Sequence, residues 1–194
     1  MRFEGTCYRA HNPRWSFKPL SGDGAAIRGA RFNPRLMPAL YLALGVMTAI
    51  KEANQGFARK IEPCVLCSYD VACDDVADLR TPEGRAEHRV SLEEVACPWF
   101  SLLAQGKEPP SWDIARRLYE EGNAGILVPS FALVRQLRTT TSFCGDGAIG
   151  LHIGSRSSIQ PVAFQRTSSP GDELVLWTNA CATVRWKEKL GAAL

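Results

Sequence analysis

Short apolar runs separated by Gly, Pro, Ser and Asp recur along this chain and predict where its strands lie. Residues 39–44 (ALYLAL) end at Gly45, and residues 1–9 and 61–71 are two further candidate strands. The runs GILVPSF, AIGLHIG, PVAFQ and ELVLW follow from Gly125 onwards. Several short strands at this spacing favour an antiparallel or mixed sheet over a doubly wound one.

One stretch with helical spacing directly follows the ALYLAL run. Residues 46–58 (VMTAIKEANQGFA) are mostly good helix formers. This helix would place Val46, Ala49, Ile50 and Ala53 on one face. Glu52 then lies near the edge of the apolar stripe.

Further helices are expected in the middle of the chain. Thr81 followed by Pro82 is typical of a helix start. Residues 112–121 predict another helix, with Asp113 in its first turn and Gly122 at its end. Before residue 38, Pro and Gly interrupt any period, so Gly22-Asp23-Gly24 is interpreted as a flexible loop. The fold class is therefore α+β, with a mixed or antiparallel sheet as core and flanking helices.

Length and charge limit the possible classes of protein. A chain of 194 residues with 45% hydrophobic and 22% charged content fits one domain over residues 1–194. The net charge of +3 is mild and spread out, which argues against direct nucleic-acid binding. The sequence contains no run of about 18 apolar residues and no apolar leader. We therefore expect no membrane contact and a cytoplasmic location.

The cysteines predict free thiols and not a metal site. Seven of them are scattered along the chain, and this odd number suits a reducing compartment. Cys64 and Cys67 have the spacing of zinc ligands, but no second Cys or His pair lies at a matching distance. Packing in an apolar strand is the preferred interpretation, and no metal is expected.

Familiar catalytic motifs are missing from the sequence. There is no G-x-G-x-x-G and no G-x-x-x-x-G-K-[ST], so neither common phosphate-binding loop is present. His11, His88 and His152 lie far apart and outside any nucleophile motif. A hydrolase of the triad type is therefore weakly supported.

An ordered series of polar residues stands out in the first third of the chain. Arg9 ends the first strand, Arg31 lies in a loop, Tyr41 in the next strand and Glu52 in the helix. By residue type alone, a loop arginine is more often solvated, a strand tyrosine more often core, and a helical glutamate more often surface.

The segment YRAHNPRWSFKPLSGDGAAIRGARFNPRLMPALYLALGVMTAIKEA, with GILVPSF further on, resembles the RES-domain family, which is named for an Arg, a Glu and a Ser. The resemblance implies a fold like that of ADP-ribosyltransferases and an enzyme that attacks NAD+. It assigns the family Arg to Arg31, the Glu to Glu52 and the Ser to Ser130, with Arg9 and Tyr41 at further pocket positions.

The roles implied follow from the chemistry of NAD+. Loss of nicotinamide creates an oxocarbenium-like ribose, which a carboxylate at Glu52 would stabilise. Arg9 and Arg31 would bind the pyrophosphate through planar guanidinium groups. Tyr41 would stack on nicotinamide, and Ser130 would hydrogen-bond its amide or the ribose.

The chain departs from the family pattern at several positions near these motifs, among them the position of a family glycine near Leu36 or Met37. Ala30 and Phe32 stand where the family often has glycine and tryptophan, and Leu127 and Val128 where it commonly has arginine and tyrosine. We expect an altered pocket polarity, which leaves the ADP-ribose acceptor open. Transfer to a cellular enzyme, plausibly one of nucleotide synthesis, and degradation of NAD+ with water or phosphate are both retained.

Many RES-domain proteins are toxins of toxin–antitoxin pairs, so the resemblance also implies a cognate antitoxin with a helical DNA-binding domain. We expect a segment of it to insert into the active site. The basic residues that would attract such a segment are Arg9, Arg14, Arg28, Arg31 and Arg35. The alternative is a catalytically inactive module that pairs with a regulatory partner.

Overall fold

The computed structural model describes residues 1–53, 63–131, 171–177 and 183–193. All of them belong to one compact unit, formed by Met1–Ala132 and Ser168–Leu194. The second unit, Leu133–Thr167, lies outside the described residues, so a single domain over 1–194 stays a prediction.

The unit is built on one mixed sheet of seven strands. Their order is β4 (Val76–Asp78), β5 (Gly125–Pro129), β6 (Asp172–Leu176), β2 (Leu40–Ala43), β1 (Phe3–His11), β3 (Cys64–Cys73) and β7 (Thr183–Ala193). Neighbouring strands are antiparallel except β4 and β5. The prediction of an α+β fold with a mixed sheet is confirmed. The runs AIGLHIG and PVAFQ lie outside the described residues.

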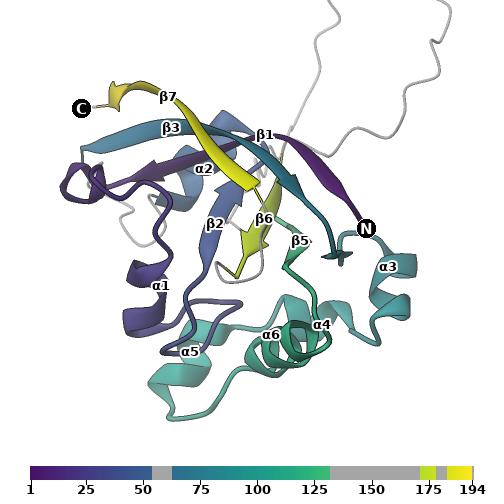
Figure 1. Ribbon diagram of the computed structural model, residues 1–194. Helices are drawn as coiled ribbons and strands as arrows, with labels where there is room; N and C mark the ends of the chain where they lie inside the picture. Colours follow the sequence, from purple (N-terminus) through teal and green to yellow (C-terminus); the bar gives the residue numbers. More distant parts are fainter. Residues whose placement is uncertain (54–62, 132–170, 178–182, 194) are drawn as a thin grey trace, which may run out of the picture. The chain divides into compact units, whose positions relative to one another are not determined.

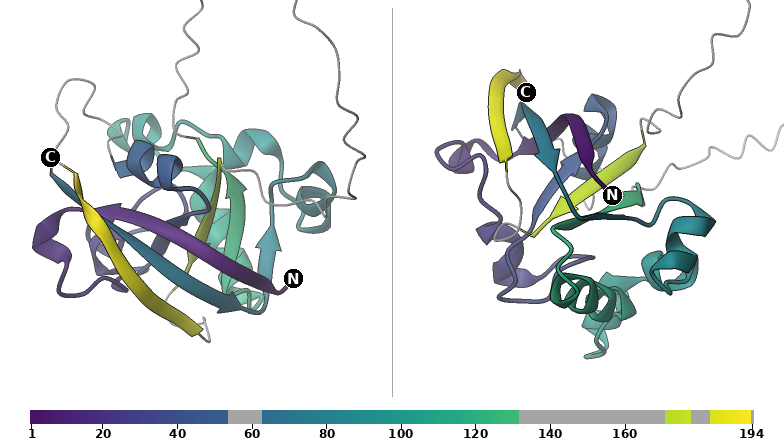
Figure 2. Two further views of the ribbon diagram at one scale, coloured as in Figure 1. Left: turned by 90° about the horizontal axis from the view of Figure 1, so that it is seen from above. Right: turned by 45° about the vertical axis from the view of Figure 1, so that its right-hand side comes forward.

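The sheet changes direction between β1 and β2. These two strands share a single register pair, Tyr8 with Ala43, whereas β1 and β3 pair along their whole length. Figure 1 and Figure 2 show β1, β3 and β7 running across β2, β6 and β5. Leu42 of β2 and Leu174 of β6 join Cys7 and Tyr69 in one buried cluster between the two halves.

Alternation along the strands supplies a second core on the other face. In β5, Leu127 belongs to the first cluster, whereas Ile126 belongs to a second one with Leu118 and Ala115 of α6 (Pro110–Glu120). The helices α3 (Pro82–Glu87), α4 (Leu92–Val95), α5 (Trp99–Ala104) and α6 lie in the segment between β4 and β5 (Figure 1). None of the helices that the structure describes combines the length and apolar character needed to cross a bilayer.

The expected helix boundaries are close to those observed. The Thr81 hydroxyl accepts a hydrogen bond from the Gly84 backbone and caps α3, with Pro82 at its first position. Asp113 lies in the first turn of α6, and Gly122, with φ +89°, follows its end. α2 (Val46–Ala53) begins as predicted, and residues 54–58 lie outside the described part of the chain.

The interpretation of Gly22-Asp23-Gly24 as a flexible loop is wrong. Gly22 is the N-cap of α1 (Asp23–Arg28), and a short 3-10 helix, η1 (Pro13–Trp15), precedes it. A Cβ atom on Gly22 would lie 2.7 Å from the Ala39 nitrogen, so glycine is needed there for close packing. Asp23 then favours the first turn through the helix dipole.

The described cysteines are free thiols in the interior. Cys64 and Cys67 are buried in β3, and Cys67 belongs to the core between the two halves of the sheet. Cys144 and Cys181 lie outside the described residues. No group of three or more His, Cys, Asp or Glu side chains in the described ranges is arranged to hold a metal ion.

Candidate active site

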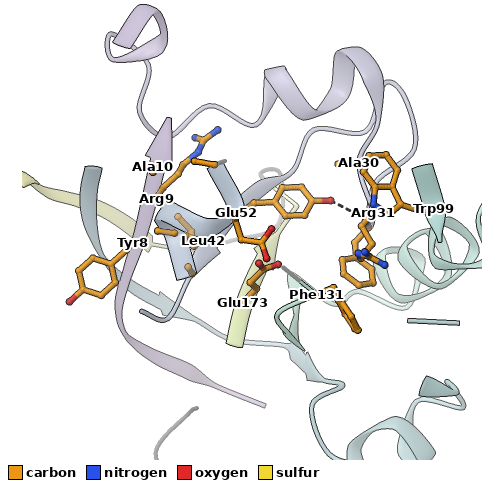
Figure 3. A pocket seen from close by; sticks show the side chains of 15 residues that line it. Tyr8, Arg9, Ala10, Ala30, Arg31, Leu42, Glu52, Trp99, Phe131 and Glu173 are labelled. Carbon is orange, nitrogen blue, oxygen red and sulfur yellow. Dashed lines mark hydrogen bonds between the residues drawn. The ribbon is translucent and has the colours of Figure 1, made fainter. Parts of the chain in front are cut away.

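A cavity of about 250 Å³ lies beside α2, β1, β2 and β6. It is slightly smaller than the roughly 300–1,000 Å³ typical of small-molecule sites, and the lining residues named here are those in the described part of the chain. Four charged residues line it, namely Arg9, Arg31, Glu52 and Glu173, together with the aromatic residues Tyr8, Phe32, Tyr41, Trp99 and Phe131. Figure 3 shows the two carboxyl groups side by side, with the Arg31 guanidinium and Phe131 ring across from them.

Glu52 lies in the last turn of α2 and points into this cavity (Figure 3). The Ser130 hydroxyl, directly after β5, donates a hydrogen bond of 2.7 Å to Glu52 Oε1. Ser130 does not itself line the cavity. Its hydroxyl is thus directed at the carboxylate, whereas the sequence predicts a bond to the nicotinamide amide or the ribose.

Glu173 in β6 is a second acidic residue of the cavity, and sequence reasoning missed it. Its side chain is buried, with 8% of the residue exposed. Burial, followed by the hydrogen bond and the charge of Glu52, raises the pKa of Glu173 from 4.5 to about 10. The signal in the sequence was a glutamate at the start of the apolar run ELVLW, in a strand whose other central positions are buried.

The loop that carries Arg31 is fixed by a glycine at its start. Gly29 ends α1 with φ +74°, which a side chain would disfavour. A Cβ atom there would also lie 2.8 Å from the Trp112 ring. The Trp112 indole donates a 2.7 Å hydrogen bond to the Ala30 carbonyl, so the close approach of α6 positions the residue before Arg31.

The next carbonyl groups of this loop are also held by side chains. The Ser111 hydroxyl donates to the Arg31 carbonyl, and the Trp177 indole donates to the Phe32 carbonyl at 3.2 Å. Asn33 is fully buried and its amide nitrogen donates to three backbone carbonyl groups. Because side-chain hydrogen bonds hold the backbone at each of these residues, the loop keeps Arg31 in a defined position.

The Arg31 side chain crosses one wall of the cavity. Its Nη1 donates a 2.8 Å hydrogen bond to the Cys97 carbonyl, and its guanidinium carbon lies 4.6 Å from the centre of the Phe131 ring. Burial lowers its pKa, and nearby acidic groups, Glu52 among them, oppose that shift. Arg31 therefore faces both carboxyl groups as a cation.

Arg9 lines the opposite side of the cavity, with part of its guanidinium already bound. Its Nη1 donates 3.1 Å hydrogen bonds to the carbonyl groups of Pro19 and Ser21. Burial lowers the pKa of Arg9, and the nearby Tyr69 opposes the shift. Only the remaining N–H groups are available to a ligand.

Tyr41 joins the cavity to the Arg31 loop. Its hydroxyl donates to Asn33 Oδ1 at 2.9 Å and accepts a 3.0 Å bond from the Phe32 backbone. Burial raises the pKa of this hydroxyl. Tyr41 lines the cavity, but its hydroxyl is already bound to the Arg31 loop.

Of the five arginines expected to form a basic cluster, Arg9 and Arg31 line the cavity. Arg14, Arg28 and Arg35 are exposed and are not part of its lining. Two of the five arginines therefore face the cavity, and attraction of a partner segment by all five stays a prediction.

The departures at Ala30, Phe32, Leu127 and Val128 fall in two places. Ala30 and Phe32 line the cavity, and the Phe32 ring packs against Phe131 with centroids 6.4 Å apart. Leu127 and Val128 are fully buried in β5, one in each core cluster. The expectation of altered pocket polarity thus concerns the first pair.

Comparisons with known proteins concern the fold and the family of the chain. A crystal structure of the M. tuberculosis MbcT-MbcA toxin-antitoxin complex is similar in fold, with a TM-score of 0.63 and 19% sequence identity over 98% of this chain and 85% of the other. No curated protein sequence matches the chain. The RES domain family model matches residues 6–140, which include Arg9, Arg31, Tyr41, Glu52 and Ser130 but not Glu173. Since this match covers more than half of the sequence, the chain belongs to the RES domain family.

Proposed function

We propose that this protein cleaves the bond between nicotinamide and ribose in NAD+ and passes ADP-ribose to an acceptor, acting in the cytoplasm as the toxin of a toxin–antitoxin pair. The observation that carries the proposal is the meeting of Glu52, held by Ser130, with Arg31 in one cavity. An inactive binding module has no need of a carboxylate and a guanidinium facing each other in a partly buried site.

Glu52 is the group proposed to act on the ribose. Departure of nicotinamide leaves positive charge on the sugar, so a nearby carboxylate gains attraction as the bond breaks. In a water-poor cavity this attraction is stronger than in bulk water. The Ser130 hydroxyl fixes the carboxylate through Oε1, so that Glu52 is oriented before the substrate arrives.

Arg31 is the group proposed to bind the pyrophosphate. Its guanidinium is planar, is anchored at Nη1 by the Cys97 carbonyl, and lies over the Phe131 ring. The other N–H groups are suited to phosphate oxygens. Arg9 would assist from the opposite wall, and the ring of Tyr41 is a flat surface on which nicotinamide can stack.

The acceptor of ADP-ribose is either a protein side chain or a small molecule, water or phosphate. The two reactions share the cleavage step and differ in the nucleophile. Cell lysate incubated with NAD+ labelled in its adenylate part separates them. A discrete labelled protein band indicates transfer to a protein, and labelled free ADP-ribose or its phosphate indicates degradation.

The toxin assignment rests on family membership and on the fold shared with a toxin–antitoxin complex. We propose that an antitoxin with a helical DNA-binding domain inserts a segment into the cavity and excludes NAD+. Arg31 and Arg9 favour a segment that carries a carboxylate. Expression of the chain alone should arrest growth, and co-expression with such a partner should relieve the arrest.

The direct test is release of nicotinamide by the purified full chain. NAD+ and the protein are incubated without added metal, and nicotinamide is quantified by chromatography. Release that scales with protein concentration supports the proposal. A preparation that folds, binds NAD+ and releases no nicotinamide, with or without lysate as a source of acceptor, would overturn it.

A further inference from the structure

An acidic side chain occupies an unusual position in β6. The three residues after Glu173 in this strand, Leu174, Val175 and Leu176, are fully buried hydrophobic side chains of the two cores. Glu173 is nearly as buried and lines the cavity. Burying a carboxyl group costs free energy that an apolar side chain would avoid, so packing alone does not account for glutamate here.

The surroundings of Glu173 supply one positive and one negative partner. Glu52 approaches from α2, Arg31 from the loop after α1, Ser130 from the end of β5 and Tyr41 from β2. The carboxyl groups of Glu52 and Glu173 lie side by side in Figure 3, an arrangement suited to a hydrogen bond between them. Between two carboxyl groups such a bond requires that one of them keeps its proton.

Charge balance favours Glu173 as the carboxyl group that keeps the proton. Its Oε1 is buried and has no hydrogen-bond partner among the described residues. Arg31 and Ser130 would favour a negative charge on Glu173, but burial and the neighbouring Glu52 disfavour it more strongly. Glu52, in contrast, accepts the Ser130 hydroxyl at 2.7 Å, a bond suited to an anion. With Arg31 charged and Glu173 neutral, the group of three carries no net charge. A second anion would repel the pyrophosphate.

We infer that Glu173 is a positioning residue of this site, a neutral carboxylic acid that donates a hydrogen bond to Glu52 and holds its carboxylate toward the cavity. The expected effect of Glu173 on NAD+ cleavage rests on the proposed function. The structural part of the inference, the protonation of Glu173, holds or fails independently of NAD+. Glu173 and Ser130 thus hold Glu52 from two strands of the same sheet.

The first measurement is the ¹³C NMR titration of side-chain carboxyl groups in the full chain between about pH 5 and pH 9. We expect one glutamate to remain protonated at neutral pH in the wild type, and its signal to be absent from Glu173→Gln. The inference is overturned if every carboxyl group is ionised at neutral pH. It is also overturned if the protonated signal persists in Glu173→Gln and disappears in Glu52→Gln.

The second measurement compares the kinetics of two variants. Gln donates an N–H hydrogen bond and has nearly the shape of a neutral Glu, whereas Leu has no donor. We expect Glu173→Leu to lower kcat at least about tenfold with little change in KM, and Glu173→Gln to recover most of that loss. At alkaline pH the wild type should lose activity as Glu173 ionises, whereas Glu173→Gln should not. Glu120→Gln, on an exposed side chain of α6, is the matched control.

Equal loss of kcat in both Glu173 variants, or no loss in either, would overturn the positioning role. The NMR titration keeps the inference testable if Glu173→Leu fails to fold. If the wild type consumes no NAD+ but retains a protonated Glu173, the proposed function fails and the structural inference stands. If NAD+ is consumed and Glu173 is ionised, the proposed function stands and the structural inference fails.

Discussion

The hydroxyl of Ser130 lies 2.7 Å from Oε1 of Glu52, although 78 residues separate the two in sequence. The bond joins the end of β5 to the last turn of α2, two elements that the sheet brings to one cavity. The sequence resemblance assigns both residues to the family's named Arg, Glu and Ser, and both lie within the matched residues 6–140. We therefore propose that the serine acts on the substrate through the glutamate.

Ser130→Ala tests this indirect role. Removing a hydrogen bond to a charged group costs roughly 1.5–3 kcal/mol, so kcat should fall about tenfold to a hundredfold. KM should change little, because the hydroxyl does not line the cavity. Steady-state kinetics measure both, with exposed Ser101→Ala as control. A large rise in KM at unchanged kcat would instead place the hydroxyl on NAD+.

Arg31→Ala should weaken the binding of NAD+ itself. Loss of charge-assisted bonds to phosphate predicts a Kd higher by about tenfold to a hundredfold, which calorimetry measures. Arg28→Ala removes an exposed arginine outside the cavity and should leave the Kd unchanged. Equal affinities for the wild type and Arg31→Ala would exclude Arg31 from the phosphate site.

Gly29→Ala and Gly24→Ala form a matched pair for the loop that presents Arg31. At Gly29, φ is +74° and a new Cβ would meet Trp112 at 2.8 Å, so we expect about 2–3 kcal/mol of destabilisation and weaker NAD+ binding. At Gly24, within α1, a Cβ meets nothing within 4 Å, and Ala should stabilise by about 0.5–1 kcal/mol. Thermal unfolding measures the difference, and similar effects at both positions would contradict the account.

Glu173→Gln should stabilise the fold increasingly as pH rises. Because the pKa of Glu173 is raised on folding from 4.5 to about 10, its contribution to stability is fully present below 4.5 and is lost as pH rises toward 10. Gln has no such proton to lose. The unfolding temperature of the variant should therefore exceed that of the wild type by about 2–4 °C or more at pH 8 and converge with it near pH 4. A gap that is constant with pH would contradict the raised pKa.

The local sequence pattern was sufficient to predict those strands and helices whose signals lie within a few residues of each other. The run ALYLAL and the Thr81-Pro82 pair are examples, since alternation and capping are local properties. β7 was not anticipated, because its placement depends on pairing with β3 far along the chain. The short helices α4 and α5 were also missed, although α4 begins at a local capping box of Ser91 and Glu94. The helix at Asp23 was missed because its glycine is explained by contact with Ala39, 17 residues later.

In the candidate site, too, some features could be predicted from the sequence and others depend on the packing of distant segments. Arg31 and Glu52 were identified through family resemblance, which fixes residue type but not contacts. That Ser130 would bond to Glu52, and that the Tyr41 hydroxyl would be occupied by the Arg31 loop, follows only from the packing of the sheet. Glu173 has no motif around it, and its importance arises from burial next to Glu52.

The proposed cleavage of NAD+ depends most directly on the charge of Glu52, and turnover of NAD+ by purified Glu52→Gln tests this dependence. The substitution keeps the shape and can still bind the Ser130 hydroxyl, but it removes the negative charge. We predict a fall in turnover of about a hundredfold to a thousandfold or more, with NAD+ affinity within about threefold of the wild type and no change in the Glu120→Gln control. Turnover by Glu52→Gln close to that of the wild type would contradict the proposed chemistry.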